Sequence, residues 1–151
     1  MSVIALDPGN STGYVFRRNS EDDLYGGTLG ENHLDVWGLL NHYKPDVIVY
    51  ETFQMYPGKA QKLIWNSFYP VEVIGVIKVW YKLRKEMGFD VQLVGLQPSV
   101  KKFALANTEL ELWKTVHICD KSGKATEHTR DAVRLLRYYE RNYSKCKGIS
   151  K

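Results

Sequence analysis

The stretch IALDPGNSTGYVFRR, residues 4–18, decides the fold of this chain. Its first part is an apolar run that ends in Asp7, and the Pro-Gly pair that follows favours a turn. Residues 2–6 and 13–18 therefore predict two paired strands, and residues 23–29 predict a third strand that completes an antiparallel meander. A carboxylate at the end of a buried strand needs an explanation, because burying an uncompensated charge is costly.

Helices and further strands are predicted after this meander. The helices are expected at residues 31–43, 58–88, 99–105, 109–116 and 128–143, and the strands at 47–50 and 89–96. Pro70 is expected to break or kink the long helix. We therefore predict an α/β fold in one domain, residues 1–151. Its mixed five-stranded sheet has three antiparallel strands plus two parallel strands, with helices on both faces.

The composition is that of a folded protein in a reducing compartment. The chain has 151 residues, of which 44% are hydrophobic, and its two cysteines form no disulfide framework. We see no secretion signal and no apolar stretch long enough to span a bilayer, so we expect a cytoplasmic protein without membrane contact. The net charge of +4 and the basic C-terminal region suit a polyanionic partner or a solvated surface.

Two acidic residues end predicted strands. Asp7 closes the first strand, and Glu51 closes the strand at 47–50. If these strands are parallel neighbours, both carboxylates lie at the same edge of the sheet. Functional sites of open α/β sheets gather at such carboxyl ends.

A histidine and an aspartate begin the last predicted helix. His128 and Asp131 are three residues apart, so they project from nearly one face. A helical wheel places this pair beside an apolar group formed by Ala132, Leu135, Leu136 and Tyr139. The opposite side carries Arg130, Arg134, Arg137 and Arg141. We therefore expect the pair to point inward and the arginines to point outward, toward a polyanionic partner or toward solvent.

A divalent cation would balance these acids. Carboxylate oxygens are the ligands that Mg²⁺ prefers, and two ions about 4 Å apart can activate water and stabilise the leaving oxygen of a phosphodiester. We therefore expect metal ions at Asp7, Glu51, His128 and Asp131. Each residue also has a structural explanation: a turn aspartate, a surface glutamate, a packed or capping histidine and a first-turn aspartate that favours the helix dipole.

Three motifs together resemble the RuvC-type Holliday junction resolvases of the RNase H-like superfamily. They are IALDPGNSTGY at residues 4–14, DVIVYETF at 46–53 and HTRDAVRLL at 128–136, and their order and spacing fit nearly the whole chain. The resemblance implies an RNase H-like fold with Asp7, Glu51 and Asp131 as catalytic, metal-binding acids. His128 stands where many relatives carry another aspartate, and an imidazole there favours Mn²⁺ over Mg²⁺.

The resemblance also suggests how the chain contacts DNA. Lys101 is the catalytic candidate for contacting the scissile phosphate, and Lys102 is its substitute. The family's junction-probing loop corresponds to residues 52–62. There, aromatic rings would stack on bases and lysines would meet phosphates, and these residues are Phe53, Tyr56, Lys59 and Lys62. Arg130, Arg134 and Arg137 would add contacts to the DNA backbone.

The family likeness implies a homodimer, because a two-fold dimer matches the two equivalent strands of a four-way junction. The long helix would supply the interface or only cover the sheet with Trp65, Phe68, Tyr69, Ile77 and Trp80. The segment 101–128 departs from the family pattern, with acids at Glu109 and Glu111, which leaves the choice among junctions, forks and flaps open. Compact, divergent relatives of this kind are typical of bacteriophages, so we expect a phage origin.

The predicted function is that of a structure-specific endonuclease on branched DNA. It would hydrolyse phosphodiesters with two Mg²⁺ or Mn²⁺ ions, leaving 5′-phosphate and 3′-hydroxyl ends. One alternative is a non-catalytic DNA-binding domain of the same fold. Another is an actin-like phosphate-binding ATPase, whose first phosphate loop also has aspartate, glycine and threonine after a strand. That class needs two such domains and a second glycine-rich loop, which this chain lacks.

Overall fold

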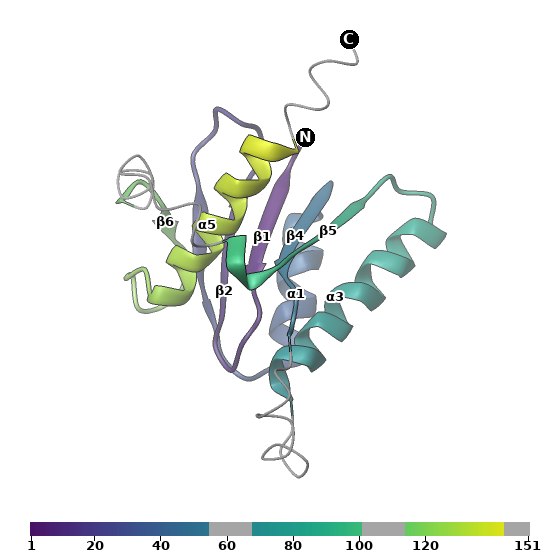
Figure 1. Cartoon of the computed structure of the whole chain (residues 1–151), viewed down its shortest axis with the longest axis horizontal. Helices are drawn as coiled ribbons and strands as arrows, with labels where there is room; N and C mark the ends of the chain where they lie inside the picture. Colours follow the sequence, from purple (N-terminus) through teal and green to yellow (C-terminus); the bar gives the residue numbers. More distant parts are fainter. Residues whose placement is uncertain (55–67, 101–113, 144–151) are drawn as a thin grey trace.

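The structure, a computed structural model, describes residues 1–54, 68–100 and 114–143. Those residues form strands β1 (Val3–Asp7), β2 (Thr12–Arg17), β3 (Tyr25–Leu29), β4 (Val47–Glu51), β5 (Gln92–Leu96) and β6 (His117–Ile118). They also form helices α1 (His33–Tyr43), α3 (Tyr69–Glu86) and α5 (Glu127–Asn142). In Figure 1, α1 and α3 lie on one side of the strands and α5 lies on the other side.

The described strands form one mixed sheet in the order β5-β4-β1-β2-β3-β6. β1, β2 and β3 pair antiparallel, while β4 is parallel to both β1 and β5. This confirms the predicted meander with two added parallel strands. The prediction of five strands is wrong by one, because β6 also pairs with β3 in parallel. β6 has only two residues, too few for an alternating pattern to reveal it in the sequence.

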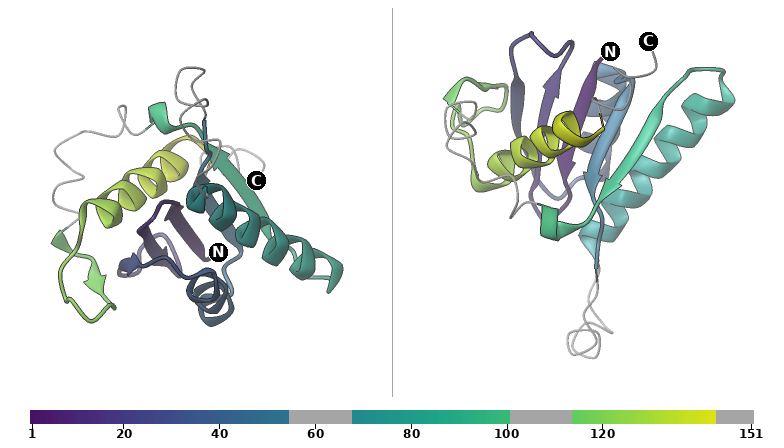
Figure 2. Two further views of the ribbon diagram at one scale, coloured as in Figure 1. Left: turned by 90° about the horizontal axis from the view of Figure 1, so that it is seen from below. Right: turned by 45° about the horizontal axis from the view of Figure 1, so that its top comes forward.

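Helices cover both faces of the sheet, as predicted (Figure 2). Successive strand residues point to opposite faces. Ile4 and Leu6 therefore pack toward α1 and α3, whereas Ala5 packs toward α5. The predicted inner side of the last helix is confirmed, since Ala132, Leu135, Leu136 and Tyr139 are all buried.

Helix α3 begins with Pro70 in its first turn. Proline is tolerated there because the first helical N–H groups lack partners inside the helix. The predicted break is therefore a helix start. Residues 58–67, including Trp65, lie outside the described residues, as do most of the predicted helices at 99–105 and 109–116.

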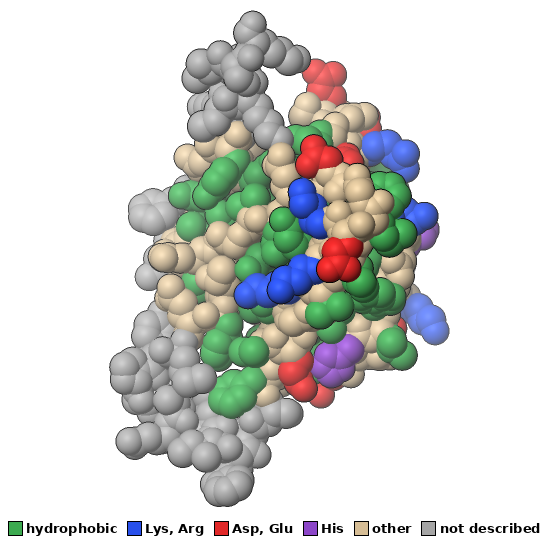
Figure 3. Space-filling model, turned by 90° about the vertical axis from the view of Figure 1, so that its right-hand side faces the viewer, with side chains coloured by type: hydrophobic (Ala, Val, Ile, Leu, Met, Phe, Trp, Pro, Cys, Tyr) green, Lys and Arg blue, Asp and Glu red, His purple; other side chains and the backbone are tan. Residues whose placement is uncertain are grey.

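The aromatic residues of α3 cover the sheet. Tyr69, Ile77 and Trp80 are buried in the core, and Trp80 Nε1 donates a hydrogen bond to Asn41 Oδ1 at 2.8 Å. The outer side of α3 exposes other apolar residues, namely Val71, Val79 and Leu83. On the face in Figure 3, apolar side chains are interspersed with basic and acidic ones. Within the described ranges, no helix has the length and apolar character needed to cross a bilayer.

Candidate metal centre

Two acids lie side by side at the carboxyl ends of adjacent parallel strands. The β1–β4 register pairs Leu6 with Tyr50, and Asp7 and Glu51 are the next residue of each strand. Ala5 and Val49, two residues earlier, both pack in the core beneath α5. Because side chains alternate along a strand, Asp7 and Glu51 also face the α5 layer.

Asp7 is nearly buried, and the start of α5 lies against it. Its residue exposure is 7%, and its Oδ2 atom is 3.7 Å from His128 Nδ1. That distance is too long for a direct hydrogen bond but short enough for an ion pair when the imidazole is protonated. The structure therefore brings together the acid of the first motif and the histidine of the last.

Glu51 is half-buried, and its Oε2 atom is shielded from solvent. In the β4–β5 register it stands opposite Leu96, a core residue beneath α5. Keeping a carboxylate oxygen away from water is costly unless a cation or a hydrogen-bond donor is near. Together with Asp7, it places negative charge on this edge of the sheet.

Asp131, the other acid of the last motif, is half-buried and pairs with a basic residue of its own helix. Its Oδ1 atom accepts a 2.7 Å hydrogen bond from Arg134 Nη1 on the same helix. Among the described residues, no group of three or more His, Cys, Asp and Glu side chains lies close enough to hold a metal ion. The arrangement shown is a pair, Asp7 with His128, beside a neighbouring Glu51.

Hydroxyl groups fix the start of α5 on the sheet, a feature that the sequence reasoning missed. Thr126, the N-cap residue of α5, accepts from the Thr129 N–H, and its Oγ1 is 2.5 Å from Thr28 Oγ1 in β3. Thr129 is fully buried and donates from its Oγ1 to the carbonyl oxygen of Gly27 at 3.1 Å. The sequence signal was limited to two threonines near the helix start, Thr126 and Thr129, which N-capping alone would explain.

Asp120 braces the same region from the loop before α5. Its Oδ2 atom accepts from the Thr28 N–H at 3.0 Å, and its Oδ1 atom accepts from Ser122. Burial raises the pKa of Asp120, but hydrogen bonds from Ser122, Thr28 and Gly123 outweigh it, so the net pKa lies below its ordinary value. Asp120 is therefore a charged anchor and not a reservoir of protons.

The predicted DNA-contacting residues fall into four groups. Arg130 is exposed on α5. Arg134 and Arg137 are half-buried, and each pairs with an acid on its own helix, Asp131 and Glu140 respectively. Phe53 is 38% exposed, with its ring centroid 6.1 Å from that of Phe68. The remaining candidates lie outside the described residues: Tyr56, Lys59, Lys62, Lys101 and Lys102.

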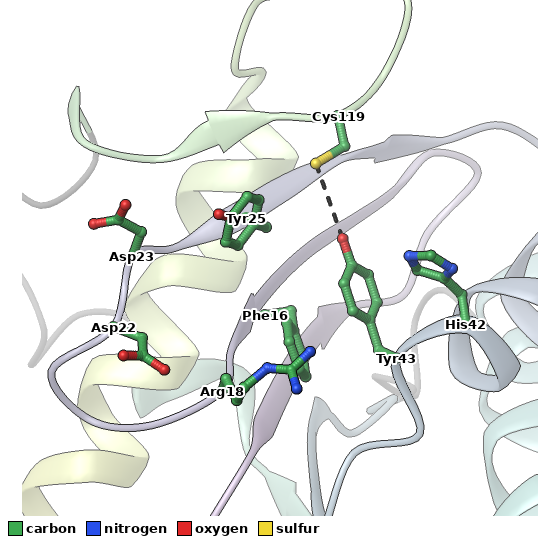
Figure 4. A pocket seen from close by; sticks show the side chains of 8 residues that line it. All are labelled: Phe16, Arg18, Asp22, Asp23, Tyr25, His42, Tyr43 and Cys119. Atoms are coloured by element: carbon green, nitrogen blue, oxygen red, sulfur yellow. Dashed lines mark hydrogen bonds between the residues drawn. The ribbon is translucent and has the colours of Figure 1, made fainter.

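A cavity of about 510 Å³ lies away from these acids. Figure 4 shows its lining: Phe16, Arg18, Asp22, Asp23, Tyr25, His42, Tyr43 and Cys119. Arg18 follows the end of β2 that pairs with the start of β1, so the cavity is remote from Asp7. There the Tyr43 hydroxyl oxygen lies 3.9 Å from Cys119 Sγ. Burial, with a smaller effect of Cys119, raises the pKa of the Tyr43 hydroxyl. The acids offset the basic groups, so this cavity lacks the positive charge that attracts a phosphate backbone.

No protein-family model and no curated protein sequence matches the chain. Solved structures match its fold. Thermus thermophilus RuvC in complex with a Holliday junction substrate aligns with a TM-score of 0.63 and 18% identity, over 95% of this chain and 97% of that chain. The fowlpox virus Holliday junction resolvase aligns with a TM-score of 0.61 and 14% identity, over 93% and 99% of the two chains.

A third similar structure is the yeast mitochondrial Holliday junction resolvase, with a TM-score of 0.51 and 12% identity over 97% of this chain and 85% of that chain. Bacterial, viral and mitochondrial proteins thus share the architecture, and they share it over nearly their whole lengths. At such low identities the likeness concerns the path of the backbone. The chain has the RNase H-like α/β fold of the Holliday junction resolvases.

Proposed function

We propose that this protein is a metal-dependent endonuclease that cuts branched DNA, four-way junctions in particular. The observation that carries the proposal is the placement of Asp7 and Glu51 at adjacent strand ends, with His128 of α5 3.7 Å from Asp7. Two similar structures, those of the Thermus thermophilus and fowlpox virus resolvases, contain junction DNA. Fold likeness raises this function above others, and the acids supply the chemistry.

The residues fit a hard divalent cation. Asp7 and Glu51 offer carboxylate oxygens on one face of the sheet, and the Asp7 carboxylate is shielded from most solvent. Mg²⁺ takes one or two carboxylates and keeps several waters, so it needs no cage of many side chains. When bound, such ions would supply the positive charge that stabilises the phosphorane-like transition state and acidifies water at neutral pH. We propose two ions for each site, Mg²⁺ or Mn²⁺.

The side chains would divide the remaining tasks. His128, beside Asp7, would bind a metal ion or orient a water molecule, and its imidazole would shift the preference toward Mn²⁺. Asp131 joins the site once its carboxylate turns away from Arg134, which leaves that guanidinium to a phosphate oxygen of the substrate. Lys101 contacts the scissile phosphate. Cleavage leaves a 5′-phosphate and a 3′-hydroxyl.

A homodimer of single-domain protomers would act on both strands of a junction. Its two-fold symmetry matches the two equivalent cleavage positions. The outer side of α3 is our proposed interface, because Val71, Val79 and Leu83 expose apolar surface there. We also propose a bacteriophage origin and a location in the bacterial or phage-infected host cytoplasm.

The test is cleavage of a labelled four-way junction by wild-type protein and by Glu51→Gln, each with and without Mg²⁺. The substitution removes one negative charge at nearly constant volume. We expect cleavage to fall at least about a hundredfold, the scale of one lost electrostatic contribution, while junction affinity stays within about twofold. Glu72→Gln is the matched control, because Glu72 is a half-exposed carboxylate on α3 that pairs with His33 at 3.8 Å.

Three outcomes are distinct. Loss of cleavage in Glu51→Gln, with Glu72→Gln unaffected, supports the site. Normal cleavage by Glu51→Gln refutes the assignment of Glu51. Wild-type protein that binds the junction tightly but never cuts it, with any divalent metal, points to a non-catalytic DNA-binding domain.

A further inference from the structure

The backbone of α5 passes directly over a glycine in β2. Gly13 is the cross-strand partner of Asp7. A Cβ atom at Gly13 would lie 2.0 Å from the carbonyl oxygen of His128 and 2.7 Å from the backbone nitrogen of Thr129. Contacts under 3.0 Å are essentially never seen for real Cβ atoms, so only glycine permits this approach.

The close approach sets the position of the histidine. Asp7 and Gly13 are paired across β1 and β2, and His128 lies on top of that pair. The distance from Asp7 Oδ2 to His128 Nδ1, 3.7 Å, therefore depends on how deeply the first turn of α5 sits against β2. A wider separation between α5 and β2 would carry the His128 imidazole away from the Asp7 carboxylate.

The helix start is also held in place on its other side. Thr129 donates to the carbonyl oxygen of Gly27, and the hydroxyl of Thr126 contacts the hydroxyl of Thr28. These bonds join α5 to β3, next to β2 in the sheet. The hydrogen bonds to β3 and the close backbone contact at Gly13 of β2 together fix the position of the first turn of α5 on the sheet.

We propose that Gly13 is a positioning residue that sets the distance between His128 and Asp7. The Thr129 hydroxyl would hold the start of α5 against Gly13. This inference rests on the proposed metal-dependent nuclease function. A methyl group at residue 13 would force the first turn of α5 to retreat by about 1.4 Å to reach ordinary van der Waals contact. The backbone at Gly13 is otherwise extended β-strand that alanine also adopts.

The test compares Gly13→Ala with Gly38→Ala, a glycine in α1 where a Cβ would meet nothing within 4 Å. Mn²⁺ binding is measured directly by electron paramagnetic resonance or calorimetry on each protein without DNA. Junction binding and single-turnover cleavage are then measured separately. Far-UV circular dichroism confirms that each variant is folded.

We expect Gly13→Ala to bind Mn²⁺ at least about tenfold more weakly, on the scale of lost outer support to a metal ligand. Its cleavage rate at saturating DNA should fall about a hundredfold, as a displacement of about 1 Å can cause. Junction affinity should fall far less than the cleavage rate, because only Arg130 among the proposed DNA-contacting residues lies in the first turn of α5. Gly38→Ala should match wild type in all three measurements.

A second pair of variants tests the clamp without added bulk. Thr129→Val removes the hydroxyl at nearly constant volume, and Thr129→Ser keeps it. We expect Thr129→Val to weaken Mn²⁺ binding and slow cleavage in the same direction as Gly13→Ala, and Thr129→Ser to retain most of both. This pair decides the question if Gly13→Ala does not fold.

Failure of the inference and failure of the proposed function give different results. Wild-type protein that cuts junctions, with Gly13→Ala or Thr129→Val equally active and equally tight for Mn²⁺, overturns the positioning role alone. Wild-type protein that binds Mn²⁺ but cuts nothing overturns the nuclease function, and weaker Mn²⁺ binding by both variants still supports the positioning role. Wild-type protein that binds no Mn²⁺ overturns both.

Discussion

Removing Glu140 should strongly destabilise the protein, because it leaves a buried arginine without its carboxylate. Arg17 is 8% exposed, and its Nη1 atom donates to Glu140 Oε1 at 2.8 Å and to the Ser20 carbonyl oxygen at 3.0 Å. Breaking a buried ion pair from one side costs about 3–5 kcal/mol. The retained Ser20 contact and the partial exposure of Glu140 put Glu140→Leu at the lower end, about 3 kcal/mol.

Arg137→Gln is the matched control. Arg137 pairs with the other oxygen of the same carboxylate at 3.0 Å, but it is a more exposed partner on the same helix. Such pairs contribute about 0.3–0.5 kcal/mol. The double variant Arg17→Met with Glu140→Leu should recover most of the loss, because apolar replacement of a whole buried pair is often neutral.

Urea unfolding followed by far-UV circular dichroism measures all four free energies of unfolding. A loss of about 3 kcal/mol corresponds to a melting temperature lower by about 6–12 °C for a chain of this size. The reasoning would be refuted if Glu140→Leu and Arg137→Gln lowered the free energy of unfolding by the same small amount, below about 1 kcal/mol. The pair matters for the candidate site because it holds the far half of α5 onto β2.

Two other predictions concern acid stability and assembly. The pKa of Asp120 is lowered in the folded protein, so its stabilising effect is present above the ordinary aspartate pKa of about 3.9 and is lost as the pH falls through its folded value. Asp120→Asn should therefore flatten the loss of melting temperature below about pH 4, and an unchanged acid profile would contradict the anchoring role. Val79→Glu places a charge on the outer side of α3, where Val79 is 53% exposed. It should turn a dimer into a monomer in sedimentation without lowering the melting temperature, and a persistent dimer would exclude this surface as the interface.

The sheet could be predicted from the sequence because its signals are local. The apolar run at 47–50 and the Pro-Gly turn after Asp7 each specify an element within a few residues. The inner side of the last helix followed from its 3.6-residue spacing. The family motifs added the order in which these elements occur, so the arrangement of β1, β2, β3 and β4 was predicted correctly.

The details of the candidate site depend on contacts between remote residues, which no local pattern reports. Asp131 pairs with Arg134 of its own helix, and a helical wheel cannot report which partner a residue at the edge of the inner side takes. The contact of His128 with Gly13 depends on how closely a helix approaches a strand. Likewise, the aromatic residues of α3 read as an interface or as a core until their burial is known, and Trp80 is in the core.

Asp7 and His128 meet in space although one lies near the beginning of the sequence and the other near its end. During synthesis on the ribosome, β1 and β4 emerge long before α5. A nascent chain can pair its strands but cannot assemble the acid and imidazole until the final helix has left the exit tunnel and packed onto the sheet. Any hydrolytic activity of the proposed kind would therefore be withheld from unfinished chains by the order of the elements alone.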